Sequence, residues 1–476
     1  MKTECNAERI VFQSLGTREV VGAFDGGKIT SDAGAMLLRE VERKTGILRQ
    51  FAACFTDHRD SELIEHTVEE LAAQRIYGLA LGYEDLNDHD RLRHDPLFAV
   101  LVGKDDPTGG DRLRARDRGK ALAGKSTLNR LELTPVGADA KSRYKKIVAR
   151  TKKMEKLFVE LFLQAHPRPP ARLVLDFDAT DDPVHGDQLG RFFHGYYQEY
   201  CFLPLYLFCG DDLLGAWLRP ANIDGAAGSV KKLAEVVRRL REVWPEVPIV
   251  VRGDSGFCRE NLMAWCEANG VDYLLGLAKN KRLTAEIADE LAAAKQQFEA
   301  TGAAARAFKD FTYCTLDSWS RTRRVVGKAE HLEKGANPRF VVTTLSAEAV
   351  PAATLYEKEY CARGEMENRI KEQQRCLFAD RTSCHTMRAN QLRLWFSSVA
   401  YTLMQALRRL GLADTPMAEA QCDTIRLKLL KIGAQIRVTV RKIWISLAEG
   451  CPYESLFRQV YRNVLSARPS WIPCRC

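Results

Sequence analysis

The alternation of strand and helix patterns between residues 171 and 282 limits the folds open to this chain more than any other feature. Three strand patterns come first, over residues 173–178, 196–209 and 213–218. Helix and strand patterns then alternate, over residues 229–243, 248–252, 260–269 and 271–277. The spacing of apolar residues distinguishes the two kinds of element. The order β-β-β-α-β-α-β predicts a mixed sheet with helices on its faces.

This order is that of an RNase-H-like core. We therefore predict an α/β fold with an RNase-H-like mixed sheet, the catalytic core, over residues 171–282 and 358–410. Residues 283–357 start with a helical pattern and change to strand-like segments, which predicts a β-rich insertion. Helical patterns dominate residues 1–165, so we expect a mainly helical N-terminal region there, and the Lys- and Arg-rich segment 141–154 within it makes it a candidate DNA-binding region. Residues 411–476 are expected to form a basic C-terminal region.

The length and the prolines support several domains. A chain of 476 residues is too long for one core, because single domains usually hold roughly 100–200 residues. The segment His166-Pro167-Arg168-Pro169-Pro170 ends the preceding helical pattern, since successive prolines cannot continue a helix. We place a domain boundary at this segment.

Positive charge is concentrated in two parts of the chain. The formal net charge is +9, and from Arg381 to the end 15 Lys and Arg face 5 Asp and Glu. Residues 141–154 have the pattern of a basic amphipathic helix, in which Lys145, Lys146 and Arg150 are candidates for contact with a DNA backbone. A solvated charged face is the alternative for this segment. Residues 435–447 have the pattern of an amphipathic strand with a basic face.

The cysteines and the apolar stretches indicate the compartment. The 14 cysteines include no C-x-x-C pair, which favours reduced thiols. A zinc site from Cys384, His385, Cys474 and Cys476 is disfavoured, because the spacings fit no tetrahedral finger. The start of the chain lacks a signal-peptide core, and no apolar stretch approaches the roughly 18 residues that cross a bilayer. We expect a protein of the cytoplasm that is not membrane-bound.

Three carboxylates are the strongest candidates for chemistry. Asp178 closes the first apolar strand pattern, and Asp254 closes the strand pattern over 248–252. Glu367 lies on a helical face with Arg363 and Lys371, which recur at every fourth residue. In α/β sheets, ligands gather at the carboxyl ends of strands. Two Asp and one Glu meeting there would offer the oxygen ligands that divalent cations prefer.

Each carboxylate also has a purely structural alternative. Asp176 points to the same side of its strand as Asp178, so either could be the ligand. Asp254 lies between Gly253 and Ser255, where an Asp commonly caps a helix, and the two roles can coexist. The helix of Glu367 could be a salt-bridged surface, worth a few tenths of a kcal/mol per ion pair. Taken singly, these signals do not decide the function.

The three carboxylates lie within longer motifs, which are Asp178-Ala179-Thr180, Arg252-Gly253-Asp254-Ser255-Gly256 and Tyr360-x-x-Arg363-x-x-x-Glu367. In order and spacing these motifs resemble those of DDE-class insertion-sequence transposases, in the branch that has a β insertion before the glutamate. The resemblance covers most of the chain, and one bacterial subgroup is especially similar. The branch usually has a lysine seven residues after the glutamate. That position is Gln374 here, and Lys371 comes earlier.

The resemblance implies a catalytic and a DNA-binding role for specific residues. Asp178, Asp254 and Glu367 would be the catalytic residues and would hold two Mg²⁺ ions, which Mn²⁺ can replace. Arg363 and Lys371 would hold the scissile-strand phosphate, with Tyr360 beside it. Related enzymes hold a flipped base against an aromatic residue of the insertion, for which Trp319 is the candidate. A buried structural tryptophan is the alternative for Trp319.

The implied function is DNA transposition in the bacterial cytosol. The chain would bind the terminal inverted repeats of its element as a homodimer on double-stranded DNA, cleave a strand at each end and join the 3′-hydroxyl to target DNA. A metal-dependent DNA endonuclease without strand transfer is the main alternative. A catalytically decayed DNA-binding protein is another, although all three carboxylates are present. A glycosidase with paired carboxylates would not need the basic segments.

Overall fold

A computed structural model describes residues 9–469. Contacts between residues divide the chain into two compact units. Unit 1 comprises Met1–Arg150, Cys376–Phe378 and Val399–Cys476, and unit 2 comprises Thr151–Arg375 and Ala379–Ser398. The sequence predicts a boundary after residue 165, whereas the structure places it after Arg150. The reason is that the helix over 151–165, α7, packs against the sheet of unit 2.

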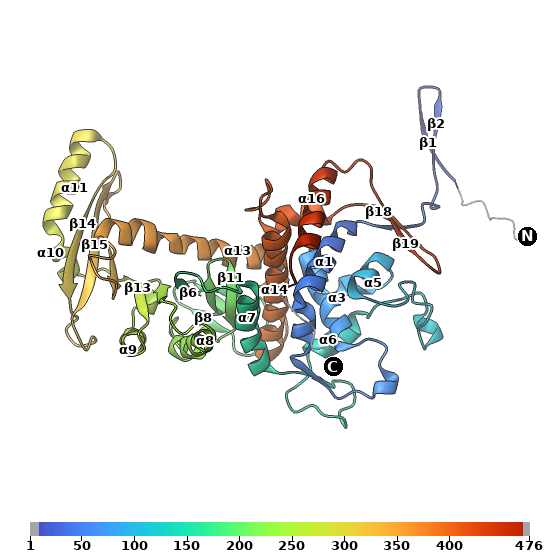
Figure 1. Ribbon diagram of the computed structural model, residues 1–476, viewed down its shortest axis with the longest axis horizontal. Helices are drawn as coiled ribbons and strands as arrows, with labels where there is room; N and C mark the ends of the chain where they lie inside the picture. The colour runs from blue at the N-terminus through green and yellow to red at the C-terminus, as the bar shows by residue number, and fades with distance from the viewer. Residues whose placement is uncertain (1–8, 470–476) are drawn as a thin grey trace, which may run out of the picture. The chain divides into compact units, whose positions relative to one another are not determined.

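A mixed sheet of nine strands is the centre of unit 2 (Figure 1). Its strands are β6 (Leu173–Ala179), β10 (Leu205–Cys209), β11 (Asp212–Trp217), β12 (Ile249–Gly253), β13 (Asp272–Leu277), β14 (Ala305–Tyr313), β15 (Arg323–Leu332), β16 (Gly335–Ala336) and β17 (Arg339–Thr343). The spatial order is β11-β10-β6-β12-β13-β17-β15-β14, with β16 beside β15. Strands β6, β12 and β13 run parallel, and the other pairs are antiparallel.

The helices of unit 2 alternate with these strands as predicted. They are α7 (Thr151–Ala165), α8 (Ser229–Val243), α9 (Glu260–Ala268), α10 (Lys281–Glu286), α11 (Ala288–Thr301), α12 (Ala352–Thr354), α13 (Gly364–Leu377) and α14 (Met387–Leu407), the last two ending in unit 1. Short turns are η5 (Ser255–Phe257), the π-helical η6 (Leu355–Tyr360) and η7 (Cys361–Arg363). The order β6, β10, β11, α8, β12, α9, β13 confirms the predicted alternation, and the large mixed sheet is consistent with an RNase-H-like fold.

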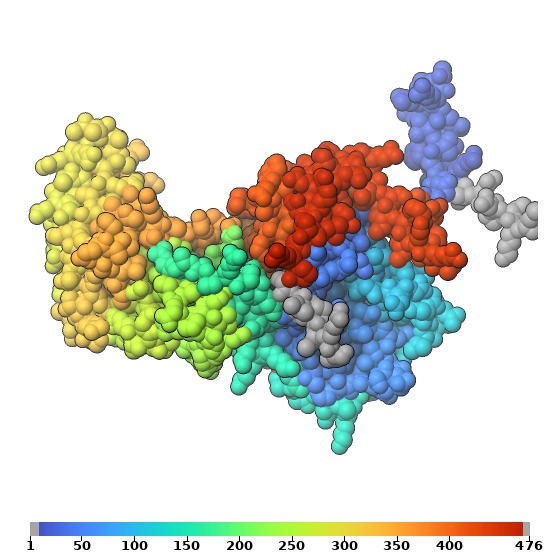
Figure 2. Space-filling model, viewed as in Figure 1, coloured from blue at the N-terminus to red at the C-terminus, as the bar shows by residue number. Residues whose placement is uncertain are grey.

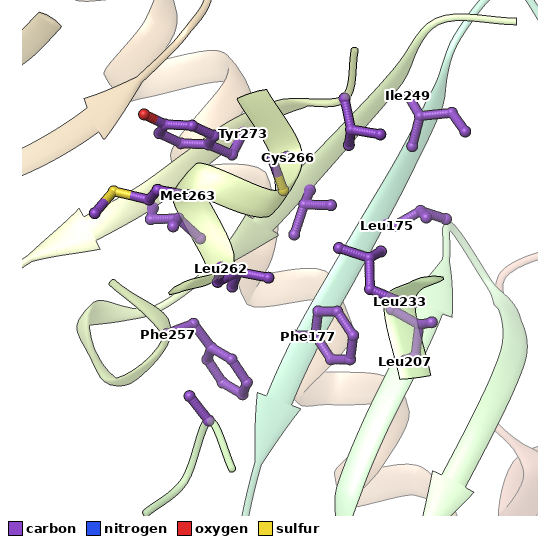
Figure 3. Packing of buried hydrophobic residues seen from close by; sticks show 14 of the residues in the cluster. Leu175, Phe177, Leu207, Leu233, Ile249, Phe257, Leu262, Met263, Cys266 and Tyr273 are labelled. Carbon is purple, nitrogen blue, oxygen red and sulfur yellow. The ribbon is translucent and has the colours of Figure 1, made fainter. Parts of the chain in front are cut away.

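Apolar side chains on one face of this sheet form the main core. Phe177 of β6 stacks on Phe257, with ring centroids 5.6 Å apart, and Leu262 and Met263 of α9 cover the same face (Figure 3). Alternation along β6 puts Leu173, Leu175 and Phe177 into this core. The intervening residues of β6, including its two aspartates, therefore project from the opposite face. The core thus fixes the orientation of the candidate catalytic strand.

A smaller cluster covers the opposite face. Val250 and Leu274 of the central strands pack there with Val341, Leu355 and Tyr356. Leu355 and Tyr356 belong to η6, the segment that leads into α13. The packing of η6 against the sheet brings the start of α13 to the face on which Asp176 and Asp178 lie.

One prediction for unit 2 is wrong in detail. The predicted strand over 196–209 is divided between β9 (Glu199–Phe202) and β10, because Pro204 interrupts the strand and cannot donate a ladder hydrogen bond. Strand β9 joins β7 (Asp182–Pro183) and β8 (Phe192–His194) in a separate small sheet. The β-rich insertion is present, but its strands β17, β15 and β14 extend the central sheet from β13.

Unit 1 combines helices with short strands. The strands are β1 (Ile10–Leu15), β2 (Arg18–Gly22), β3 (Lys28–Thr30), β4 (Phe55–Asp57), β5 (Ile147–Ala149), β18 (Ala434–Val438) and β19 (Ile443–Leu447). The α-helices are α1 (Met36–Thr45), α2 (Ile47–Ala52), α3 (Val68–Ala80), α4 (His89–Leu92), α5 (Pro96–Val102), α6 (Lys125–Glu132), α15 (Cys422–Ile425) and α16 (Glu454–Ser466). Short turns are η1 (Ala33–Ala35), η2 (Ser61–Leu63), η3 (Leu86–Asp88), η4 (Ala115–Asp117), η8 (Arg408–Leu412) and η9 (Arg426–Leu430).

Two predictions for unit 1 are corrected. The basic amphipathic helix over 141–154 is wrong, because Ile147, Val148 and Ala149 are all buried and pair with β4 as a strand. The helix starts only at Thr151. The predicted single strand over 435–447 is a hairpin of β18 and β19, and β18 also pairs with β3. Its turn lies at residues 439–442.

The cysteines and the helices of residues 9–469 bear on the predictions about thiols and membranes. The structure records no disulfide among the cysteines of this range. Cys474 and Cys476, part of the disfavoured zinc site, lie outside the described residues. None of the helices in the described range is long and apolar enough to pass through a membrane.

Candidate active site

Asp178 and Asp254 lie at the carboxyl ends of two neighbouring parallel strands. The register pairs Phe177 of β6 with Gly253 of β12, so the residue that follows each member of this pair is an aspartate. Asp254 accepts a hydrogen bond from the backbone of Gly256 at 2.9 Å and caps η5. The structural role predicted for Asp254 is thus present, and it orients the carboxylate at the strand end.

Arg363 joins Asp178 to Glu367. One guanidinium nitrogen of Arg363 lies 3.9 Å from Oδ1 of Asp178, and another donates to Oε1 of Glu367 at 2.5 Å. Glu367 is one turn along α13, and the π-helical η6 positions the start of this helix. The structure therefore brings the first and third predicted carboxylates to the same guanidinium.

The three carboxylates influence one another electrostatically. Burial raises the pKa of Asp178 to about 6, Arg363 opposes this shift, and the negative charges of Asp254 and Glu367 add to it. Burial lowers the pKa of Arg363, but Asp178 and Glu367 outweigh burial and hold it above its ordinary value. With all groups ionised, three carboxylates share one guanidinium, so negative charge is left uncompensated.

This charge and the oxygen donors fit a divalent cation, which needs hard oxygen ligands. As the side chains stand, no three Asp, Glu, His or Cys residues between 9 and 469 are arranged to hold a metal ion. The hydrogen bond to Arg363 accounts for the position of Glu367. Binding of an ion by the predicted set therefore requires Glu367 to turn from Arg363 toward the two aspartates.

Asp176 is already occupied by another partner. Arg252 faces Asp176 across the β6–β12 register and binds it through two hydrogen bonds, of 2.5 and 2.7 Å. Arg252 also donates to the backbone carbonyl of Glu359 at the end of η6. This buried pair ties the two central strands to the segment that carries Tyr360. Of the two aspartates of β6, Asp178 is the one that remains for a ligand.

Tyr360 lies close to the end of β12 because Gly276 makes room for it. A Cβ atom at Gly276 would lie 2.5 Å from the Tyr360 hydroxyl and 2.9 Å from the backbone nitrogen of Ser255. Burial raises the pKa of Tyr360, and the nearby Asp254 adds to the shift. Gly276 was not among the predicted site residues. The signal that could have found it is a glycine inside a buried strand, where another group often approaches closely.

Lys371 and Gln374 differ in their surroundings. Lys371 is exposed on α13, one turn beyond Glu367. Gln374 donates to the backbone carbonyl of Asp181 at 3.1 Å, which links α13 to the segment after β6. The residue at the usual lysine position of the family is therefore used for a structural contact.

Trp319 is placed in the apolar core, away from solvent. Its side chain is 9% exposed and meets the ring of Tyr313 edge to face at 5.8 Å. The guanidinium of Arg323 lies 5.3 Å from its ring centre. These contacts give Trp319 a structural role in the core. A DNA base could stack on its ring only if the side chains that cover the ring moved away.

Lys145, Lys146 and Arg150 belong to unit 1. Lys145 is exposed, Lys146 donates to the carbonyl of Ala140 at 2.5 Å, and Arg150 donates to the hydroxyl of Thr56 at 2.7 Å. They flank the short strand β5 and do not form one helical face. Their role in DNA binding stays a prediction.

Comparison with known proteins identifies the family. A family model described as "Transposase DDE domain group 1" matches residues 12–469 of the chain. The chain belongs to this family. It is therefore a DDE-type transposase, an enzyme class that cleaves and joins DNA strands, and the predicted family is confirmed.

A solved structure provides a further comparison with the DDE transposase chain. It is titled as the cryo-EM structure of the piggyBac transposase synaptic complex with hairpin DNA, and it is 12% identical, with a TM-score of 0.41. The match covers 92% of this chain and 82% of that one. No curated protein matches.

Proposed function

We propose that this DDE transposase binds the terminal inverted repeats of its own element, cleaves a DNA strand at each end and joins the 3′-hydroxyl ends to target DNA. The observation that carries the proposal is the grouping of Asp178, Asp254 and Glu367 around Arg363 at the ends of two parallel strands. This grouping contains acidic ligands and a phosphate-binding cation in one place.

Asp178, Asp254 and Glu367 would hold Mg²⁺ ions, two per site, with Mn²⁺ as a substitute. When bound, such ions activate the attacking oxygen and stabilise the leaving oxygen of an in-line phosphoryl transfer. Asp178 must lose its proton to act as a ligand, and burial raises its pKa to about 6 in the metal-free chain, so the carboxyl is mostly ionised above neutral pH.

Arg363 would bind the scissile-strand phosphate once Glu367 has turned away. A guanidinium offers two parallel donors that match a phosphate better than the single ammonium of a lysine. Tyr360, held beside Asp254 by the space at Gly276, would pack or donate a hydrogen bond at the same phosphate. Lys371 lies one turn beyond Glu367, exposed to solvent, and would contact the same strand farther from the site.

The reaction involves two DNA ends and a target, so we propose a homodimer on double-stranded DNA, acting in the bacterial cytosol. The piggyBac structure is, by its title, a synaptic complex, and this supports the proposal only as an analogy. The basic C-terminal region, with 15 Lys and Arg against 5 Asp and Glu from residue 381 onward, fits a polyanionic partner.

A strand-transfer assay tests the proposal. Precut and uncut element ends, identified from the inverted repeats that flank the gene, are incubated with a supercoiled target plasmid and Mg²⁺ or Mn²⁺. We expect joined products with the wild-type protein and none with Asp254→Ala or Glu367→Gln. Glu365→Gln is the matched control, because Glu365 is exposed on the same first turn of α13. Cleavage without joined product would indicate an endonuclease, and unchanged cleavage by Asp254→Ala would refute the metal site.

A further inference from the structure

The hairpin of β18 and β19, which we call the basic ribbon (residues 434–447), has two different faces. Ala434 and Ile436 point inward and pack with Ala33 and Leu97 of unit 1. The alternate residues point to solvent, and among them Arg437 lies opposite Trp444 in the register. The inner face therefore holds the ribbon to unit 1, while the outer face makes no contribution to that core. Red atoms of the C-terminal part of the chain, which includes the ribbon, lie at the surface in the space-filling view (Figure 2).

The outer face and the turn carry uncompensated positive charge. Between Asp423 and Glu449 the chain has no Asp or Glu, but it has six cations: Arg426, Lys428, Lys431, Arg437, Arg441 and Lys442. The last three are exposed and, within the described part of the chain, form no ion pair. Leaving three neighbouring cations without acidic partners costs electrostatic repulsion, which an anionic partner would relieve.

An exposed tryptophan lies among these cations. Trp444 is 46% exposed, and the charged groups of Arg437 and Lys442 lie 5.7 and 5.2 Å from its ring centre. Cations held over an aromatic ring are kept in place without being neutralised. An aromatic ring flanked by cations suits a partner that has both phosphates and exposed apolar groups, such as the thymine methyl groups of a major groove.

The turn of the ribbon is fixed by local hydrogen bonds. The hydroxyl of Thr439 donates to the carbonyl of Lys442 at 2.7 Å, and the backbone nitrogen of Lys442 donates back to that hydroxyl at 3.1 Å. Val440 at the tip is fully exposed. A preorganised tip loses less conformational freedom on binding than a flexible loop would.

We propose that the basic ribbon is a DNA-binding element that enters the major groove of duplex DNA. A two-stranded β-ribbon fits a groove about 12 Å wide. Arg437, Arg441 and Lys442 contact phosphates and base edges, while Trp444 and Val440 supply the apolar contacts. The charge of the ribbon selects a polyanion, and the choice of DNA rests on the proposed function.

The test measures binding of the full-length protein to a fluorescent duplex with an element end, across a range of salt concentrations. The variant R437Q/R441Q/K442Q is compared with R168Q/K231Q/R238Q, which removes three exposed cations from unit 2. We expect the ribbon variant to bind roughly tenfold or more weakly and to lose about 2–3 from the slope of log K against log salt. The control variant should keep most of the wild-type affinity and most of the wild-type salt slope.

A second variant separates the apolar contact of Trp444 from the contribution of the charged residues. Trp444→Ala should weaken binding while leaving the salt slope unchanged, because the indole carries no charge. Thermal unfolding of each variant verifies that unit 1 is intact. Equal losses in the ribbon and control variants, or no loss in the ribbon variant, would overturn the inference. Absence of DNA binding by the wild-type protein would instead refute the proposed function itself.

Discussion

Arg252 and Asp176 form a buried ion pair with two hydrogen bonds, 2.5 and 2.7 Å long, across the central strands β12 and β6. Burial raises the pKa of Asp176, and Arg252 opposes that shift. The pair lies directly behind the candidate active site, since Asp178 is two residues farther along β6 on the same face. It decides which of the two aspartates is available as a ligand.

Breaking this pair should destabilise unit 2. Arg252→Met leaves a buried carboxylate without its partner, and losses of about 3–5 kcal/mol are typical of such changes. Thermal unfolding checks the result, and the double variant Asp176→Leu/Arg252→Met should recover much of the stability because no charge is left unpaired. Equal stability of Arg252→Met and wild type would contradict the role of the pair.

Replacing Asp178 should stabilise the metal-free protein at neutral pH. The carboxyl has a pKa of about 6 in the folded chain against an ordinary value of 3.8, so the folded state binds the proton more tightly. Stability is therefore lost as pH rises from about 4 through about 6. Asp178→Asn lacks this loss and should gain up to roughly 3 kcal/mol at pH 7.5, with no gain at pH 3.5. A gain independent of pH would rule out this origin.

Divalent ions should make the wild-type protein more stable than variants that lack the carboxylates. Mg²⁺ or Mn²⁺ binds the folded site, and at 100 times its Kd an ion adds about 2.7 kcal/mol. The midpoint of unfolding should rise with ion concentration for the wild-type protein and for the control Glu365→Gln. It should stay constant for Asp178→Asn/Asp254→Asn. A rise in that double variant would place the ions elsewhere.

Gly276→Ala should disturb the site through Tyr360. The new methyl group would lie 2.5 Å from the Tyr360 hydroxyl, and overpacking of this kind costs about 1–3 kcal/mol. DNA cleavage should fall, and Gly276→Ala/Tyr360→Phe should recover part of the stability but not the activity. Gly195→Ala is the control, because no atom lies within 4 Å of its added methyl group. Normal DNA cleavage by Gly276→Ala would contradict the assignment of Tyr360 to the active site.

The sequence by itself determined the order of elements in unit 2, and it identified Asp178, Asp254 and Glu367 as the candidate carboxylates. Apolar periodicity is a local property, so β6, α8, β12 and α9 could be predicted from it. The glycines around Asp254 and the four-residue spacing of Arg363 and Glu367 are equally local.

Only the tertiary structure decided which residues meet. Pairing of β6 with β12 commits Asp176 to Arg252, and such register depends on contacts far apart in sequence. The same holds for β5, where pairing with β4 overrides the helical spacing of 141–154. The insertion strands could not be assigned to the central sheet for the same reason. Long-range pairing and burial set these features, and neither is encoded in the spacing of neighbouring residues.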